Sequence, residues 1–306
     1  MEQTMFTNEV ILAWLQYFSR NVDVNLAEVK MLDITGKNKN LIPTVMCNRI
    51  VLCFTDAGHP DIFYRMWNAE LGECDVWYNE GSEPSGEMKH DKVADMINRG
   101  INASAAMLIM NPNAATNYQI GIENSRFACG SVHYVCREGR AVIMNKLNVG
   151  DRDNICIISG ESIAVEAAMA ADKGRVIAVE YDPRDRDTMK ENVDKFGLNN
   201  VTIVESLEDD SLEMLPAPDV AFIVGSPKLG IEIKRLLAMN PAMDFVIYTL
   251  DFEILTSLPG LFRENGLERK EAIHLEVSRV NSKNMVEPFP APWIISGQVI
   301  RRPISG

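Results

Sequence analysis

The pattern of apolar and polar positions is clearest between Asn154 and Asp182, where two short apolar runs enclose a tight turn and a helix-length stretch. The first run, residues 155–158, is apolar throughout, as in a strand that is buried on both faces. The second run ends at the acid Glu180. The helical stretch between them carries a buried face made of Ile163, Val165, Ala167, Ala168 and Met169. The pattern predicts the opening βαβ unit of a nucleotide-binding sheet.

Upstream of this unit, the pattern predicts a smaller α/β domain. An amphipathic helix begins at Thr7 or Asn8, and residues 49–111 alternate strands with helices, one opened by Pro60 and one closed by Gly100. Between residues 111 and 136 the periodicity stops, and Asn, Ser and Gly accumulate. We therefore expect domains over residues 1–115 and 136–306, joined by a linker over 116–135.

Composition narrows the classes of function. The 306 residues, 46% of them hydrophobic, suffice for two domains with their own cores. The 43 acids and 30 bases give a net charge of -13, which argues against nucleic acid or an anionic membrane as the main partner. The chain has no run of eighteen apolar residues, and an acid, Glu2, stands where a signal peptide would be basic. We expect a cytoplasmic protein.

The six cysteines form no CxxC pair and have no histidine at zinc-ligand spacing. Cys53 and Cys156 lie within apolar strand patterns, where a thiol behaves as a small hydrophobic group. We expect reduced, structural cysteines and no metal site.

The smaller domain resembles part of a known family. The stretches VLCFTDAGHPDIFYRMW, DVWYNEGSEPSGEMKHDKVADM and MLIMNPNA are similar to the C-terminal subdomain of a tetrapyrrole methylase of the cobalamin pathway. That family's N-terminal half has no counterpart before residue 20, which implies that its own catalytic centre is absent. His59 directly precedes Pro60, and we interpret it as structural. The matching residues are Thr55, Asp56, Asn79, Glu80, Gly81 and Glu87.

The larger domain resembles the decarboxylating precorrin (cobalt-precorrin) methyltransferase family over nearly all of residues 136–298, in REGRAVIMNKLNVGDRDN, VIAVEYDPRDRDTMKENVDKFGLNNVTIVES, PDVAFIVGS, FVIYTLDFEILTSL and PAPWIISGQ. The resemblance implies an α/β fold, in which a class I, Rossmann-like, seven-stranded sheet binds S-adenosylmethionine (AdoMet) and a smaller N-terminal α/β domain accompanies it. It also implies methyl transfer to a corrinoid precursor with loss of CO2, and a homo-oligomer.

The resemblance also implies the residues of the site. Glu180 can accept both hydroxyls of a ribose, although it can also be a solvated acid before a helix that starts at Pro183. Arg137, Arg140 and Arg279 can pair with the carboxylates of a tetrapyrrole, or can form surface salt bridges instead. The residues expected around AdoMet are Ser159, Gly160, Glu161, Glu180, Ser206, Leu207, Gly225 and Ser226.

The first turn departs from the family pattern. Relatives carry Asp-x-Gly-x-Gly-x-Gly, whereas this chain has Ile155, Ile157, Ser159 and Glu161 at the four defining positions. Glu161 has two interpretations. It can be an ordinary acidic residue at the start of a helix, or it can be an anion at the place where the helix N-terminus would otherwise attract the carboxylate of AdoMet. The helix dipole stabilises a carboxylate there by roughly 0.3 to 1 kcal/mol. We expect weak AdoMet binding. Two functions stay open: a methyltransferase, and a non-catalytic relative that acts as a tetrapyrrole-binding or assembly module.

Overall fold

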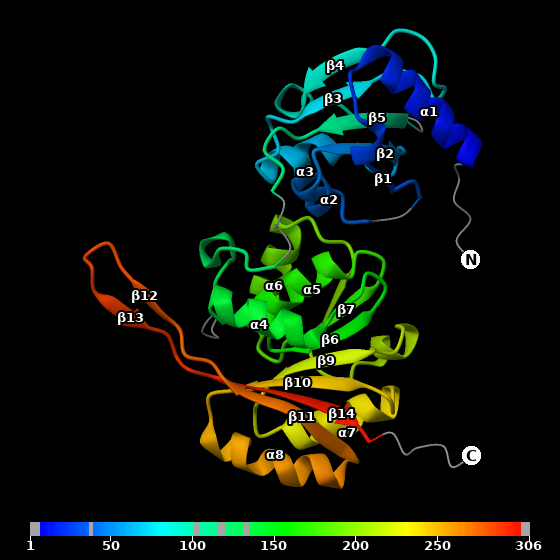
Figure 1. The fold of residues 1–306 in the computed structure, drawn as a ribbon. Helices are drawn as coiled ribbons and strands as arrows, with labels where there is room; N and C mark the ends of the chain where they lie inside the picture. The colour runs from blue at the N-terminus through cyan, green and yellow to red at the C-terminus, as the bar shows by residue number, and fades with distance from the viewer. Residues whose placement is uncertain (1–6, 37–38, 101–104, 116–119, 131–134, 301–306) are drawn as a thin grey trace. The chain divides into compact units, whose positions relative to one another are not determined.

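The computed structural model describes residues 7–36, 39–100, 105–115, 120–130 and 135–300 (Figure 1). The chain divides into two compact units, residues 1–119 with 194–199, and residues 120–193 with 200–306. In the described ranges, no helix combines the length and the apolar character that crossing a bilayer requires.

The first unit contains a five-stranded sheet in the order β1-β2-β5-β3-β4 (Figure 1). β1 and β2 pair in parallel, and the other neighbours are antiparallel. Its elements are α1 (Asn8–Asn21), β1 (Val29–Asp33), α2 (Leu41–Cys47), β2 (Ile50–Thr55), α3 (Ile62–Asn68), β3 (Asp75–Tyr78), β4 (Lys89–Lys92) and β5 (Ala105–Met110).

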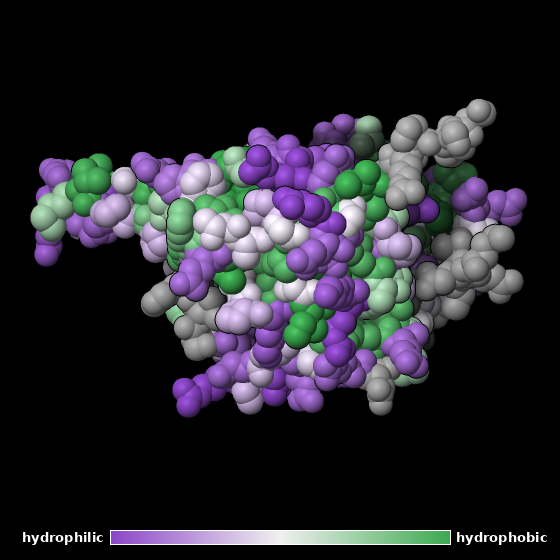
Figure 2. Space-filling model, turned by 90° about the horizontal axis from the view of Figure 1, so that it is seen from below, coloured by the Kyte–Doolittle hydropathy of each residue, from purple (hydrophilic) through white to green (hydrophobic). Residues whose placement is uncertain are grey.

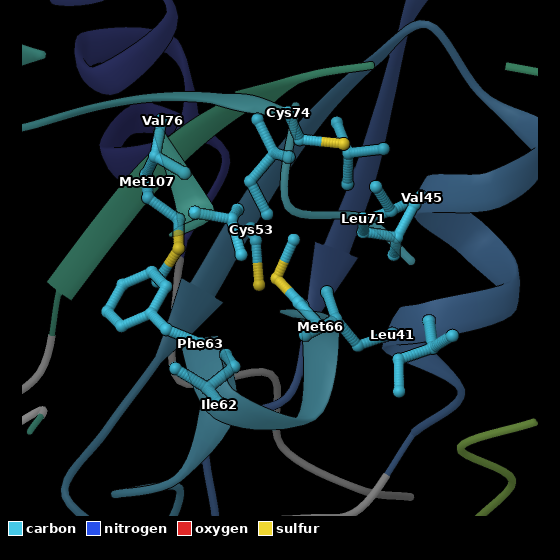
Figure 3. Packing of buried hydrophobic residues seen from close by; sticks show 14 of the residues in the cluster. Leu41, Val45, Cys53, Ile62, Phe63, Met66, Leu71, Cys74, Val76 and Met107 are labelled. Carbon is cyan, nitrogen blue, oxygen red and sulfur yellow. The ribbon is translucent and has the colours of Figure 1, made fainter. Parts of the chain in front are cut away.

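Strand β2 is buried on both faces, which explains its unbroken apolar run. Leu52 and Phe54 belong to one core cluster, together with Trp14 and Phe18 of α1. Cys53 belongs to the opposite cluster, which Figure 3 shows between the sheet and the helices α2 and α3. The sheet of the first unit therefore separates two hydrophobic cores.

Most predicted elements of the first unit are confirmed, and one is wrong. α1 begins at Asn8, and the Thr7 hydroxyl accepts a hydrogen bond from the amide of Val10. The helix expected before Gly100 is only a three-residue 3-10 helix, Val93–Asp95, because the preceding residues pair as the edge strand β4. His59 is buried, and its Nδ1 lies 3.2 Å from Asp56 Oδ1, in agreement with a structural role.

The second unit contains a seven-stranded sheet in the order β11-β14-β10-β9-β6-β7-β8. The five strands from β8 to β10 are parallel, and β14 and β11 continue the sheet in antiparallel pairing. The predicted class I methyltransferase sheet with two C-terminal closing strands is confirmed. The strands are β6 (Asn154–Ile158), β7 (Arg175–Val179), β8 (Val201–Val204), β9 (Val220–Val224), β10 (Asp244–Thr249), β11 (Leu267–His274) and β14 (Trp293–Val299).

Helices cover both faces of this sheet (Figure 1). The helices α4, α5 and α6 lie on one face, and α7 and α8 lie on the other, where they pack on a large apolar cluster. An arm formed by β12 (Ser278–Val280) and β13 (Val286–Pro288) extends away from the sheet. The helices are α4 (Arg137–Leu147), α5 (Glu161–Ala170), α6 (Pro183–Lys195), α7 (Leu229–Met239) and α8 (Phe252–Glu264).

The strand order of this sheet indicates where a ligand can bind. β6 lies between β7 and β9, so the chain leaves β6 toward one side of the sheet and later returns to the other side. In open α/β sheets, ligands bind beyond the carboxyl ends of the strands at such a reversal of strand order. The turn after β6, residues 159–160, stands at this point.

Candidate functional site

The turn after β6 is tight, although only one of its residues is glycine. Ser159 has φ +55°, a left-handed conformation that costs a residue with a side chain about 1 to 2 kcal/mol, and its amide donates to the carbonyl of Val179 at 3.0 Å. A Cβ on Gly160 would lie 2.8 Å from Ile157 Cγ2 and 2.9 Å from the Phe222 ring. Packing therefore requires glycine at position 160, and the left-handed backbone conformation falls on Ser159.

Three carboxyl groups meet beyond this turn: Glu161 at the start of α5, Glu180 directly after β7, and Asp185 in the first turn of α6. We call them the carboxylate cluster. Glu180 and Asp185 are only 1% and 4% exposed. The amide of Gly160 donates to Glu180, and the amide of Gly130 donates to Glu161. Glu180 Oε1 and Glu161 Oε1 are nevertheless buried without a hydrogen-bond partner.

Burial and mutual repulsion raise the pKa values of two members of this cluster, Glu161 and Glu180. Burial raises the pKa of Glu180 to about 8, and the neighbouring Glu161 and Asp185 add to the rise. Burial, followed by repulsion from Asp185, raises the pKa of Glu161 to about 7. A site that holds two such acids near neutral pH is a strong candidate for ligand binding.

Segment 128–130 lies against the cluster. A Cβ on Gly130 would collide with Glu161 Oε1 and would lie 2.7 Å from Asp185 Oδ1. Ala128 is held by Asn192 of α6, whose Oδ1 accepts from the Ala128 amide at 2.7 Å and whose Nδ2 donates to the Ala128 carbonyl at 3.3 Å. A side chain at position 130 would require the carboxyl groups of Glu161 and Asp185 to move.

A buried ion pair holds the backbone a few residues before segment 128–130. Arg140 of α4 and Glu166 of α5 are both fully buried, and Arg140 Nε donates to Glu166 Oε1 at 2.9 Å. The amides of Gly121 and Ile122 donate to the same carboxylate at 3.2 and 3.0 Å. The rest of the guanidinium donates to Asn124 Oδ1 and to the carbonyls of Val135 and Ile122.

The expectation that Arg140 binds a substrate carboxylate does not fit this structure, because the guanidinium is enclosed and its donors are in use. Arg137 and Arg279 lie at the surface. Arg137 pairs with Glu123, and Arg279 Nη2 donates to both oxygens of Glu138 at 2.9 Å. These two arginines form surface ion pairs, which was the alternative interpretation of their sequence positions.

The expected adenine border lies after β8. Ser206 Oγ accepts from the amide of Glu208 at 3.1 Å, and Leu207 packs at the edge of the apolar cluster under α7 and α8. Tyr181, which the sequence analysis did not select, packs at the same cluster and donates to Glu232 Oε1 at 2.7 Å. In the sequence, only its position next to Glu180 indicated that Tyr181 lies near the site.

Gly225 and Ser226 follow β9, as expected. Ser226 Oγ accepts from the amide of Lys228 at 3.1 Å, so it caps a turn. Gly225 lines a pocket of about 280 Å³ at the carboxyl ends of β9 and β10, with Cys136 of the α4 N-terminus and Tyr248. Burial, with a contribution from Cys136, raises the pKa of Tyr248 to about 12, so its phenol can donate a hydrogen bond at neutral pH. The pocket is further lined by Val135, Gly139, Val224, Thr249, Leu250, Asp251, Phe289, Pro290 and Pro292.

The described residues contain no group of three or more His, Cys, Asp or Glu side chains arranged to hold a metal ion. All six cysteines are free thiols.

Comparison with known proteins finds a similarity to one family in this region. Residues 135–283 match the family model of the precorrin methyltransferase domain. A relative from Sulfolobus acidocaldarius, "Probable cobalt-precorrin-6B C(15)-methyltransferase (decarboxylating)", is 40% identical over 70 residues, which is 22% of this chain and 36% of the relative. A protein of the same name from Sulfurisphaera tokodaii is 39% identical over 70 residues. The matched stretch thus spans about a third of the length of these curated relatives.

Two solved structures are similar to the same part of the chain. The precorrin-6y C5,15-methyltransferase of Geobacter metallireducens has a TM-score of 0.55 and 26% identity, covering 59% of this chain and 98% of that one. The precorrin 8W decarboxylase of Methanobacterium thermoautotrophicum has a TM-score of 0.50 and 20% identity, covering 58% of this chain and all of that one, and shows the same fold.

We expect Arg140→Ala to lower the free energy of unfolding by about 3 to 5 kcal/mol, because it leaves the Glu166 carboxylate buried without its counter-charge. Arg137→Ala, which removes an exposed ion pair, is the control and should cost less than about 1 kcal/mol. Urea unfolding of both variants measures the difference. An Arg140→Ala protein as stable as the Arg137→Ala protein would contradict the role of the pair.

We also expect stability to fall as the pH rises from about 5 to about 8. The folded protein holds protons on Glu161 and Glu180 up to pKa values of about 7 and about 8, whereas the unfolded chain releases them near 4.5. The stability contribution is therefore complete below the unfolded pKa and is lost as the pH passes through the folded values, at about 1.4 kcal/mol for each raised pKa unit. Urea unfolding across this pH range should show that the free energy of unfolding falls less steeply with pH in Glu180→Gln than in the unmodified protein. The exposed Glu191→Gln on α6 should keep the original slope.

Proposed function

From the membership of residues 135–283 in the family of precorrin methyltransferase domains, we propose that this protein transfers a methyl group from AdoMet to a corrinoid precursor and releases CO2 from an acetate side chain of that precursor. The observation that carries the proposal is the buried, unpartnered Glu180 Oε1 at the carboxyl end of β7. It stands next to the reversal of strand order, where such sheets bind nucleotides.

The residues present fit AdoMet at the ribose position. Gly160 donates to one oxygen of Glu180 and leaves Oε1 as an acceptor for a ribose hydroxyl. Leu207 and Tyr181 provide apolar surface at the edge of the neighbouring cluster, where an adenine ring can pack. When bound, AdoMet would supply the activated methyl group.

The protein's own part is to orient the two reactants, because methyl transfer from AdoMet needs little acid-base chemistry. The pocket at Gly225 and Tyr248 lies at the carboxyl ends of β9 and β10, on the same edge of the sheet as Glu180. We assign this pocket to the methyl acceptor. Its walls include Val135, Val224 and Phe289, and the Tyr248 phenol can donate a hydrogen bond to an acceptor carboxylate.

One observation favours the second candidate, a non-catalytic module. Gly130 lies against Glu161 and Asp185, and its amide donates a hydrogen bond to Glu161. In that case the pocket at Tyr248 would bind a tetrapyrrole edge, and no methyl group would move. Binding of AdoMet separates the two candidates.

We expect calorimetry at about pH 9, above the raised pKa of Glu180, to detect AdoMet binding to the whole chain, with a Kd at least about tenfold higher in Glu180→Ala, since the ribose loses a charged acceptor worth about 1.5 to 3 kcal/mol. The control is Glu191→Ala, which removes an exposed acid of α6 and should leave the Kd unchanged. Incubation with a carboxylated corrinoid precursor should then give a product that has gained a methyl group and lost CO2, detected by mass spectrometry. Absence of AdoMet binding would favour the non-catalytic module.

The protein should also self-associate through the arm. Val280, Met285 and Val286 are 66%, 56% and 67% exposed, and Figure 2 shows hydrophobic residues at the outer end of the arm, at the left, beyond the body of the molecule. At the base of the arm, Arg279 pairs with Glu138 and lies over the ring of Phe289, which holds the projecting strands. A second copy of the chain can cover this surface.

Light scattering at micromolar concentration should therefore give a mass above that of one chain. Replacing Val280 and Val286 with Ser should lower this mass, because each lost apolar contact weakens the association. Lys283→Ser in the same hairpin is the control and should leave the mass unchanged. A monomeric mass for the unmodified protein would refute the association.

A further inference from the structure

A second pocket in this unit has an apolar floor and a basic mouth. It lies between α8 and the two closing strands β11 and β14, and its volume of about 390 Å³ is within the range of small-molecule sites. We call it the α8 groove. Two of its lining residues, Arg263 and Arg269, are exposed and carry positive charge. Its floor is made of four buried apolar side chains: Leu258, Phe262, Leu267 and Ile295.

The two arginines of the α8 groove have no charged partner. Arg263 lies in the last turn of α8, and Arg269 lies in β11. Across the ranges that the structure describes, neither guanidinium forms an ion pair or a side-chain hydrogen bond. Acids outnumber bases in this chain by 43 to 30, and other arginines, such as Arg235 and Arg279, do pair with carboxylates. The positive charge at the groove is therefore available to a ligand.

The strand pairing points Arg269 toward α8. Arg269 lies opposite Gly297 of β14. A Cβ on Gly297 would lie 2.8 Å from the ring of Phe262, so this face of the strand is the one that α8 covers. Residues that lie opposite each other on neighbouring strands share a face of the sheet. The Arg269 side chain is therefore on the same side of the sheet as the apolar floor.

A β-bulge separates Arg269 from an acidic residue of its own strand. The register shifts between Arg269 and Glu271, so Glu271 lies opposite Ser296. The shift places Glu271 on the other face, where it pairs with Lys146 of α4 at 2.7 Å. In a regular strand, residues 269 and 271 would share one face, and the acid would lie beside the arginine. The bulge thus keeps a carboxylate of the chain away from the groove.

We propose that the α8 groove binds a small amphipathic carboxylate of the fatty-acid kind, with its alkyl chain on the apolar floor and its carboxylate at Arg263 and Arg269. The planar guanidinium group matches the geometry of a carboxylate, and the floor offers only apolar side chains to the rest of the ligand. The site is separate from the pocket at Tyr248, and the inference does not depend on the proposed function.

The test is calorimetry on the full chain near neutral pH, with octanoate, decanoate and decanol as the probes. We expect one decanoate to bind per chain, about tenfold more tightly than octanoate, because its longer chain buries more apolar surface. Decanol should bind severalfold more weakly than decanoate. A hydroxyl loses less hydration than a carboxylate does, so an apolar pocket without the arginines would give the opposite order.

Variants separate the head group from the chain. Replacing Arg263 and Arg269 together with Ala should remove the preference for decanoate over decanol, a ratio that a loss of folded material does not alter. The control is Lys270→Ala, which removes a neighbouring cation of β11 that lines a different pocket, and it should keep the preference. Ala272→Leu should weaken decanoate more than octanoate, because the larger side chain takes space from the end of the alkyl chain.

Three results would overturn the inference and leave the proposed function intact. Decanol that binds as tightly as decanoate to the unmodified protein would show that no carboxylate is recognised. An unchanged preference in the double arginine variant, or an Ala272→Leu protein with unchanged affinities, would place the probe elsewhere. If no probe binds and the double variant has a lower mass in light scattering than the unmodified protein, a second copy of the chain occupies the groove instead.

Discussion

The buried ion pair between Arg140 and Glu166 is the constraint on which the site of the second unit depends. It joins α4 to α5, and its remaining hydrogen bonds hold the backbone at Gly121 and Ile122. The same chain segment then runs to Gly130, which lies against the carboxylate cluster. A charged pair is a costly way to join two helices, because both ions lose their water. The ion pair instead fixes the positions of the groups around it. The planar guanidinium binds four partners in fixed directions, which apolar contacts cannot do.

Much of this fold could be predicted from the sequence, because the second unit is built from unbroken apolar strands and amphipathic helices in regular alternation. The stretch from β6 to Glu180 has the expected strands, turn and helix, and the helix residues expected to be buried are buried. The helix expected before Gly100 was wrong because pairing of β4 with β3 outweighed local helical spacing. The resemblance of the first unit to half of a tetrapyrrole methylase stays a prediction, since the family model covers only residues 135–283.

The site was less predictable, for a physical reason. Glu180 could be found because it ends a strand. Asp185 could not, because in sequence it is one acid among several in a polar helix, and its burial depends on contacts from a distant segment. Segment 120–130 has no periodicity, so the sequence could not place Gly130. Arg140 was selected for its charge, whereas the structure uses that charge inside the protein.

The turn after β6 combines backbone strain and electrostatic repulsion at one place. Ser159 adopts a left-handed conformation that glycine would adopt without cost, and Glu161 adds a charge that burial disfavours. Both features lower the stability of the folded protein: Ser159 through its backbone strain, and Glu161 because burial and repulsion from Asp185 disfavour its ionised form. The two costs meet at the carboxyl end of β6, where the strand order reverses, and this is the place at which open α/β sheets bind ligands.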